Sequence, residues 1–103
     1  MTREPMITEH ALLTIAGGRE LEFERAFAQA RPLIEKMPGF IELFLLRGLE
    51  NESTYLLLVD WKTVADHEIG FRQSPEYEQW KELLHGFYEP FPTVEHFREI
   101  DLP

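Results

Sequence analysis

The stretch FIELFLLRGLENESTYLLLVDW, residues 40–61, decides the predicted fold of this chain. It contains two apolar runs, 40–49 and 54–61, on either side of the polar segment 50–53. Two such runs around a short polar segment are typical of a β-hairpin, here with a four-residue loop. Alternate side chains of a strand point to opposite faces, and both faces of this hairpin are mainly apolar. Both faces of the resulting sheet therefore need cover.

The residues before the hairpin predict a strand and an amphipathic helix. The strand, 6–16, has an apolar face that includes Glu9. Its other face consists of Thr8, His10, Leu12 and Thr14. The helix, 19–37, has apolar residues at the spacing of one helix face. Pro32 lies inside it and lacks an N–H group, so we expect a kink or a separate last turn.

The residues after the hairpin predict two short helical segments and a last strand. The segments, 63–72 and about 75–87, are separated by Ser74 and Pro75, which suit the N-cap and the first position of a helix. Residues 93–100 alternate in polarity as a fourth strand. The order β-α-β-β-α-β is that of the ferredoxin-like α+β fold, with a four-stranded antiparallel sheet and helices on one face.

We interpret residues 1–103 as one domain of this fold. The helices would leave the second face of the sheet open, and no predicted element remains to cover it. A second copy packed sheet against sheet would cover this face, so we predict a homodimer that forms a dimeric α+β barrel. The alternative is a sheet whose second face is exposed in patches.

The composition limits the classes of partner. The formal net charge of -9 opposes binding to phosphate backbones, so we expect no nucleic-acid partner. The chain has no cysteine, which excludes disulfides and thiolate chemistry and fits a reducing compartment. The first ten residues lack the apolar segment of a secretion signal, and no apolar run approaches the roughly 20 residues of a membrane helix. We therefore predict a cytoplasmic protein without a membrane partner.

The common catalytic and metal motifs are missing from the sequence. His67 and Glu68 begin a zincin-like pattern, but Phe71 occupies the position of the second histidine. No two histidines are spaced three or four residues apart, so we expect no metal site. No serine lies in a Gly-x-Ser-x-Gly turn, and the glycines at 17 and 18 lack the spacing of a dinucleotide site. A covalent hydrolase and a nucleotide cofactor are disfavoured.

The stretch 67–85, HEIGFRQSPEYEQWKELLH, gathers histidines and aromatic rings, and it predicts one wall of a pocket for a small organic ligand. We expect His10 of the first strand to face the same layer as His67. An enclosed histidine can act as a general base on an acidic phenol or enol, so His10 and His67 are the candidate catalytic residues. The candidate substrate-binding residues are Phe71, Tyr77, Trp80 and His85.

Simpler structural roles remain open for the same residues. Trp80, Leu84 and Phe87 have the three- and four-residue spacing of a helix face that packs in the core. His67 and His85 can be exposed surface residues. His96 is most simply a solvated or interface residue of the last strand.

Several segments resemble the antibiotic biosynthesis monooxygenase (ABM) family of dimeric α+β barrels. They are KMPGF at 36–40, LLVDW at 57–61, the stretch 67–80 with its SPEY, and VEHF at 94–97. The resemblance covers nearly the whole chain, and it implies the ferredoxin-like fold and a dimer. It also implies one of several activities: cofactor-independent oxygenation of polyketide quinol-type substrates, haem degradation, or isomerisation of a signal molecule.

The haem-degrading branch of that family can be compared position by position. It has an Asn on the first strand, a Trp three residues before the serine of the Ser-Pro step, and a His seven residues after that serine. The matching positions here hold His10, Phe71 and Lys81, so the resemblance disfavours haem degradation. Other branches often carry a His where this chain has Phe71.

Three functional hypotheses follow from the sequence. The first is a cofactor-independent monooxygenase of a small aromatic or quinol-type substrate, in which the substrate carbanion reacts with O2 directly and no cofactor is needed. The second is a non-catalytic dimeric protein that binds a small molecule or acts in a stress response. The third is a haem-handling protein.

Overall fold

The computed structural model describes residues 6–103 as a four-stranded antiparallel sheet with helical segments between its strands. The elements are β1 (Ile7–Thr14), α1 (Glu20–Glu35), β2 (Phe40–Arg47), β3 (Thr54–Trp61), the π-helix η1 (Asp66–Phe71), α2 (Pro75–Leu84), the 3-10 helix η2 (His85–Phe87) and β4 (Val94–Phe97). The strand order β2-β3-β1-β4 confirms the predicted ferredoxin-like α+β fold. Residues 1–5, part of the stretch used to predict the absence of a secretion signal, lie outside the described residues.

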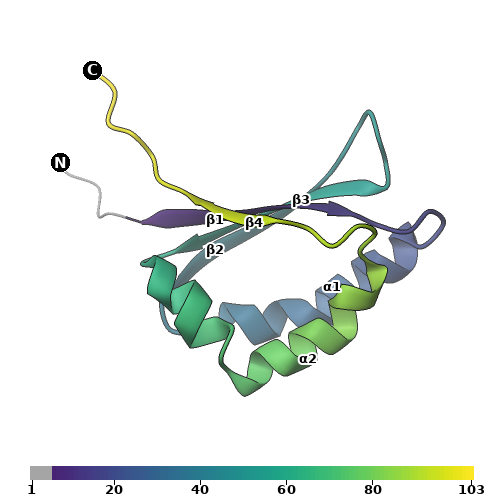
Figure 1. The fold of residues 1–103 in the computed structure, drawn as a ribbon, viewed down its shortest axis with the longest axis horizontal. Coiled ribbons are helices and arrows are strands. Elements are labelled where there is room, and N and C mark those ends of the chain that lie inside the picture. The colour runs from purple at the N-terminus through teal and green to yellow at the C-terminus, as the bar shows by residue number, and fades with distance from the viewer. Residues whose placement is uncertain (1–5) are drawn as a thin grey trace.

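Both α-helices lie against the same side of the sheet, as Figure 1 shows. The core fills the space between these two layers, because β1 and β3 each present every second side chain to the helices. On β3 the buried set is Tyr55, Leu57, Val59 and Trp61. The intervening residues of β3 point to the side of the sheet that carries no helix.

The helices differ from the predictions in two respects. Helix α1 continues through Pro32 to Glu35, so of the two alternatives, a kink or a separate last turn, the separate turn is wrong. Pro32 is exposed, and the carbonyl group that loses its helical partner there can be solvated. The segment predicted as the helix 63–72 forms the π-helix η1 over 66–71, in which the Arg72 amide donates to the carbonyl of His67 at 3.0 Å.

Two connections also differ from the predictions. The hairpin loop has six residues, 48–53, rather than four, since β2 ends at Arg47. The Gly48 amide donates to the Thr54 carbonyl at 2.7 Å and closes this loop. Strand β4 has four residues, Val94–Phe97, rather than the predicted 93–100, and its last residue Phe97 pairs with Thr8 of β1.

Gly39 ends the α1–β2 connection in a conformation that favours glycine, with φ at +85°. A Cβ atom at this position would also overlap the side chain of Asp66. We expect Gly39→Ala to lower the free energy of unfolding by on the order of 2 kcal/mol, measured by urea denaturation. Gly17→Ala is the matched control, because a Cβ there meets nothing within 4 Å. Equal urea midpoints for the two variants would contradict this account.

Candidate functional site

Glu9 is a buried carboxyl group on the helix-facing side of the sheet. It is 6% exposed, although its neighbours on that face of β1 are apolar. The indole Nε1 of Trp61 donates a hydrogen bond to Glu9 Oε1 at 3.0 Å. Strand β1 lies between β3 and β4 in the sheet, so Glu9 is shielded by backbone on both sides. A polar group in such a place needs hydrogen-bond partners.

The imidazole of His67 lies close to Glu9 on the helix side of the sheet. Its Nε2 is 3.3 Å from Glu9 Oε1, and its ring stacks on Trp61 with 5.6 Å between the ring centroids. Its Nδ1 is 2.8 Å from Nε2 of His96 on β4. The π-helical turn of η1 holds this ring against the sheet, and such wide turns are frequent at functional sites.

Burial controls the protonation of the Glu9–His67 pair. It raises the pKa of Glu9 from 4.5 to about 7, against the opposing effects of the Trp61 hydrogen bond and the Arg72 charge. It lowers the pKa of His67 from 6.5 to about 3, and the positive charge of Arg72 acts in the same direction. Both groups are therefore uncharged when Glu9 holds its proton. A carboxyl group with a pKa near 7 is suited to general acid–base chemistry.

A small cavity of about 50 Å³ opens beside this pair, between the sheet and the second helical layer. The structure brings five of the six predicted site residues to it: His67, Phe71, Tyr77, Trp80 and His85. Phe71 and Trp80 are 1% and 5% exposed, and they form its back wall as part of the hydrophobic core. Their core role and their position at the cavity are thus compatible.

The outer side of the cavity is covered by a cluster of contacting rings. His85 packs against Tyr77, Tyr88 and Phe91, with ring centroids between 4.9 and 6.0 Å apart. Phe91 is 62% exposed and lies at the outside of this cluster. These rings and the exposed Arg72 belong to the part of the cavity lining that faces solvent.

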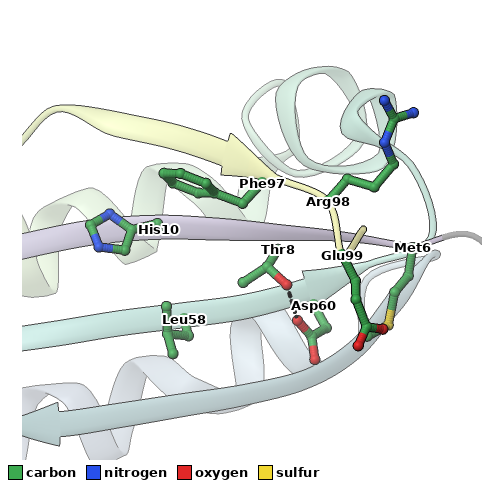
Figure 2. Close-up of a pocket in the computed structure, with 8 residues that line it drawn as sticks. All are labelled: Met6, Thr8, His10, Leu58, Asp60, Phe97, Arg98 and Glu99. Atoms are coloured by element: carbon green, nitrogen blue, oxygen red, sulfur yellow. Dashed lines mark hydrogen bonds between the residues drawn. The ribbon is translucent and has the colours of Figure 1, made fainter. Parts of the chain in front are cut away.

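His10, the sixth predicted residue, lies on the opposite side of the sheet, so the prediction that it shares a cavity with His67 is wrong. Glu9 and His10 are neighbours on β1 and must point to opposite faces. Figure 2 shows His10 beside Phe97 in an open hollow of about 600 Å³. This hollow is lined by Met6, Thr8, His10, Leu58, Asp60, Phe97, Arg98 and Glu99.

The face around His10 is apolar at its centre and polar at one end. Two cross-strand rows run over β1, β3 and β2: Leu12–Leu56–Leu46 and His10–Leu58–Phe44. Leu12 and Leu46 are about half exposed. At the polar end, the Thr8 hydroxyl donates to Asp60 Oδ1 at 2.7 Å, as drawn in Figure 2. His10 Nδ1 is buried and has no hydrogen-bond partner among residues 6–103.

Two residues of the site were missed from the sequence, namely Glu9 and His96. Glu9 could have been identified from the sequence, because it is the single charged residue on the apolar face of β1. His96 was interpreted as a solvated or interface residue, and its side chain is 18% exposed, so it is only partly solvated. It pairs with Glu9 across the β1–β4 ladder and points to the helix side, where it contacts His67.

Metal-binding clusters and membrane-spanning helices are both missing from residues 6–103. Within that range, no three or more His, Asp or Glu side chains are arranged to hold a metal ion. None of the helices described there is both long and apolar enough to span a membrane.

The family model described as antibiotic biosynthesis monooxygenase matches residues 6–83. The chain belongs to this family. Its relatives include the uncharacterized protein YczJ of Bacillus subtilis (strain 168), with 54% identity over 92% of this chain and 100% of that protein. The ABM assignment from the resemblance is therefore confirmed.

Solved structures of ABM proteins share the whole architecture. A Bordetella bronchiseptica protein whose name places it in the family has a TM-score of 0.89 and 38% identity, covering 93% of this chain and 98% of that one. SnoaB of Streptomyces nogalater, a cofactor-independent oxygenase, has a TM-score of 0.74 and 21% identity, covering 96% and 95%. At that identity the likeness to SnoaB shows the fold alone.

Proposed function

We propose that this ABM-family protein is a cofactor-independent monooxygenase that oxygenates a small aromatic, quinol-type substrate in the helix–sheet cavity. The observation that carries the proposal is the buried Glu9–His67 pair facing a ring-lined cavity. Family membership and the shared fold with a cofactor-independent oxygenase support it. The proposal moves the role of base from the two histidines to Glu9, with the imidazole of His67 beside it.

The proposed reaction oxidises a reactive methylene group conjugated to a phenol, so that the methylene carbon and O2 give a carbonyl group and water. The Glu9 carboxylate accepts the acidic proton, and the carbanion forms a C–O bond with O2. Protonated Glu9 then returns the proton to the peroxide. The O–O bond breaks as the second C–H proton leaves, which gives the carbonyl product and water. The surrounding rings orient the substrate and exclude bulk water.

The substrate needs more room than the described conformation provides. A cavity of about 50 Å³ is well below the ~300 Å³ at the lower end of ligand pockets. We infer that the ring cluster of Tyr77, His85, Tyr88 and Phe91 moves outward when substrate enters. Tyr77, His85 and Tyr88 are only partly buried, and the outermost ring of the cluster, Phe91, is mostly exposed.

Oxygen uptake tests the proposed function and the reassignment of the base together. With a panel of hydroquinones and phenols that carry a reactive methylene group, we expect the wild-type protein to consume O2 without added cofactor. His67→Asn should lower the rate, because it removes the imidazole that lies 3.3 Å from Glu9 Oε1. His10→Asn should keep it, because His10 lies on the other face of the sheet. Saturable binding without uptake for every compound would indicate a non-catalytic binding protein instead.

The open face of the sheet is proposed to pair with a second copy of the chain. Its apolar rows include Leu12, Phe44 and Leu46, which are 44–53% exposed, and a C2 dimer would place the same patch of each copy against the other. We expect light scattering after size exclusion to give a dimer for the wild type and a monomer for Leu12→Glu. Leu21→Glu is the matched control, because Leu21 is 61% exposed on α1, away from this face. A wild-type monomer at micromolar concentration would contradict the pairing.

A further inference from the structure

We propose that His67 and His96 form a proton path between the carboxyl group of Glu9 and the surface beside Glu68. The use of this path during turnover rests on the proposed function, whereas the path itself does not. It would let Glu9 exchange protons with solvent while the ring-lined cavity stays closed over a ligand.

The distances form a continuous series from the interior outward. Glu9 Oε1 is 3.3 Å from His67 Nε2, and His67 Nδ1 is 2.8 Å from His96 Nε2. His96 Nδ1 is 3.9 Å from Glu68 Oε1, a gap that solvent water can bridge. The exposed fraction of the side chains is 7% for Glu9, 3% for His67, 18% for His96 and 51% for Glu68. The series therefore begins in the core and ends in solvent.

The path leaves Glu9 on a different side from the cavity. Glu9 and His67 line the cavity, but His96 and Glu68 do not. The outer side of the cavity is covered by the ring cluster, so a bound ligand would separate Glu9 from water on that side. The two imidazole rings would remain as its connection to solvent.

Proton transfer along this path changes only which ring nitrogen of His67 and of His96 carries the hydrogen. Glu9 gives its proton to Nε2 of His67, and His67 passes its Nδ1 proton to Nε2 of His96. His96 releases its Nδ1 proton to water or to the Glu68 carboxylate. One proton leaves Glu9, one arrives at the surface, and both rings end neutral; the reverse sequence reloads Glu9.

The surroundings of the pair favour this concerted shift over a charged intermediate. The groups that face it are Trp61 from β3, Arg72 after η1, His96 from β4 and the phenol of Tyr88. Arg72 is positive, and burial already lowers the pKa of His67, so a doubly protonated His67 is disfavoured. Trp61 donates to Glu9 in either protonation state and holds the carboxyl group in place.

The test follows protonation of Glu9 by time-resolved infrared spectroscopy after a pH jump, with no substrate present. The carboxyl band is assigned by its absence in Glu9→Gln. We expect His96→Ala to slow the change about tenfold or more relative to the wild type. Added imidazole should restore the rate, because it has two exchangeable nitrogens. Added 1-methylimidazole should not, because one nitrogen is blocked.

Every other outcome of this experiment would contradict the proposed proton path. A wild-type rate in His96→Ala would show that protons reach Glu9 by another way. If both compounds restored the protonation rate of His96→Ala equally, or if neither did, His96 would have a structural role instead. Thermal unfolding of the variant would then measure how far its loss destabilises the fold. Because no substrate is used, a failed oxygen-uptake assay would leave this result standing, and a failed pH jump would leave the proposed oxygenation intact.

Discussion

Glu9→Gln is expected to lower the turnover of a quinol-type substrate by on the order of 10²- to 10⁴-fold, the usual contribution of a positioned general base. The amide cannot accept the substrate proton. Its oxygen can still accept the hydrogen bond from Trp61 Nε1, so the fold around β1 is expected to persist. The measurement is the initial rate of oxygen uptake at saturating substrate, together with KM. We expect the loss in kcat rather than in KM, because the rings of the cavity wall are unchanged.

Glu82→Gln is the matched control for this substitution. Glu82 is an exposed glutamate on α2, so the same change of charge there should leave the rate unaltered. A Glu9→Gln protein that turns over substrate at the wild-type rate would contradict the role of Glu9 and would place the base elsewhere in the chain.

The stability of the protein should depend on pH through Glu9. Its pKa is about 7 in the folded chain and near 4.5 when unfolded, so folding favours the protonated carboxyl group. That contribution is complete below pH 4.5 and is lost as the pH rises through 7. Relative to Glu9→Gln, the wild type should lose on the order of 3 kcal/mol of unfolding free energy across this window, at about 1.4 kcal/mol per pKa unit.

His67 should act in the opposite direction. Its pKa is about 3 when folded and 6.5 when unfolded, so its contribution is complete above pH 6.5 and is lost as the pH falls toward 3. The two effects oppose each other between pH 4.5 and 6.5, so single variants are needed to separate them. Urea denaturation of the wild type, Glu9→Gln and His67→Asn at a series of pH values measures both. A pH-independent difference between the wild type and Glu9→Gln would contradict the buried, protonated carboxyl group.

The sequence was sufficient for the order of elements and for the two faces of β1, because a period of two assigns each side chain to one face. It did not show which face the helices cover. The more apolar set of β1 is buried, and Glu9 is buried with it, so His10 is left on the open face. The cap Ser74 and first position Pro75 of α2 were predicted correctly. The π-helical turn of η1 was missed, since it depends on how His67 and Phe71 pack on Trp61.

The chemistry of the site depends on contacts that are distant in the sequence. His96 reaches Glu9 through the β1–β4 ladder, and His67 reaches both through the packing of η1 on the sheet. No local pattern contains these three residues. The candidate aromatic residues were found because rings at helical spacing serve as core and as cavity wall at once, as Phe71 and Trp80 do here.

The most direct test of the central claim is the fate of isotopically labelled O2 (oxygen-18) in a chelator-treated, cofactor-free preparation with a quinol-type substrate. We expect the wild-type product to carry one labelled oxygen atom, with the other recovered in water, and Glu9→Gln to form almost none of this product. The proposed oxygenation would be contradicted if substrate bound saturably but gained no labelled oxygen. The role of Glu9 would be contradicted if Glu9→Gln formed the product at the wild-type rate.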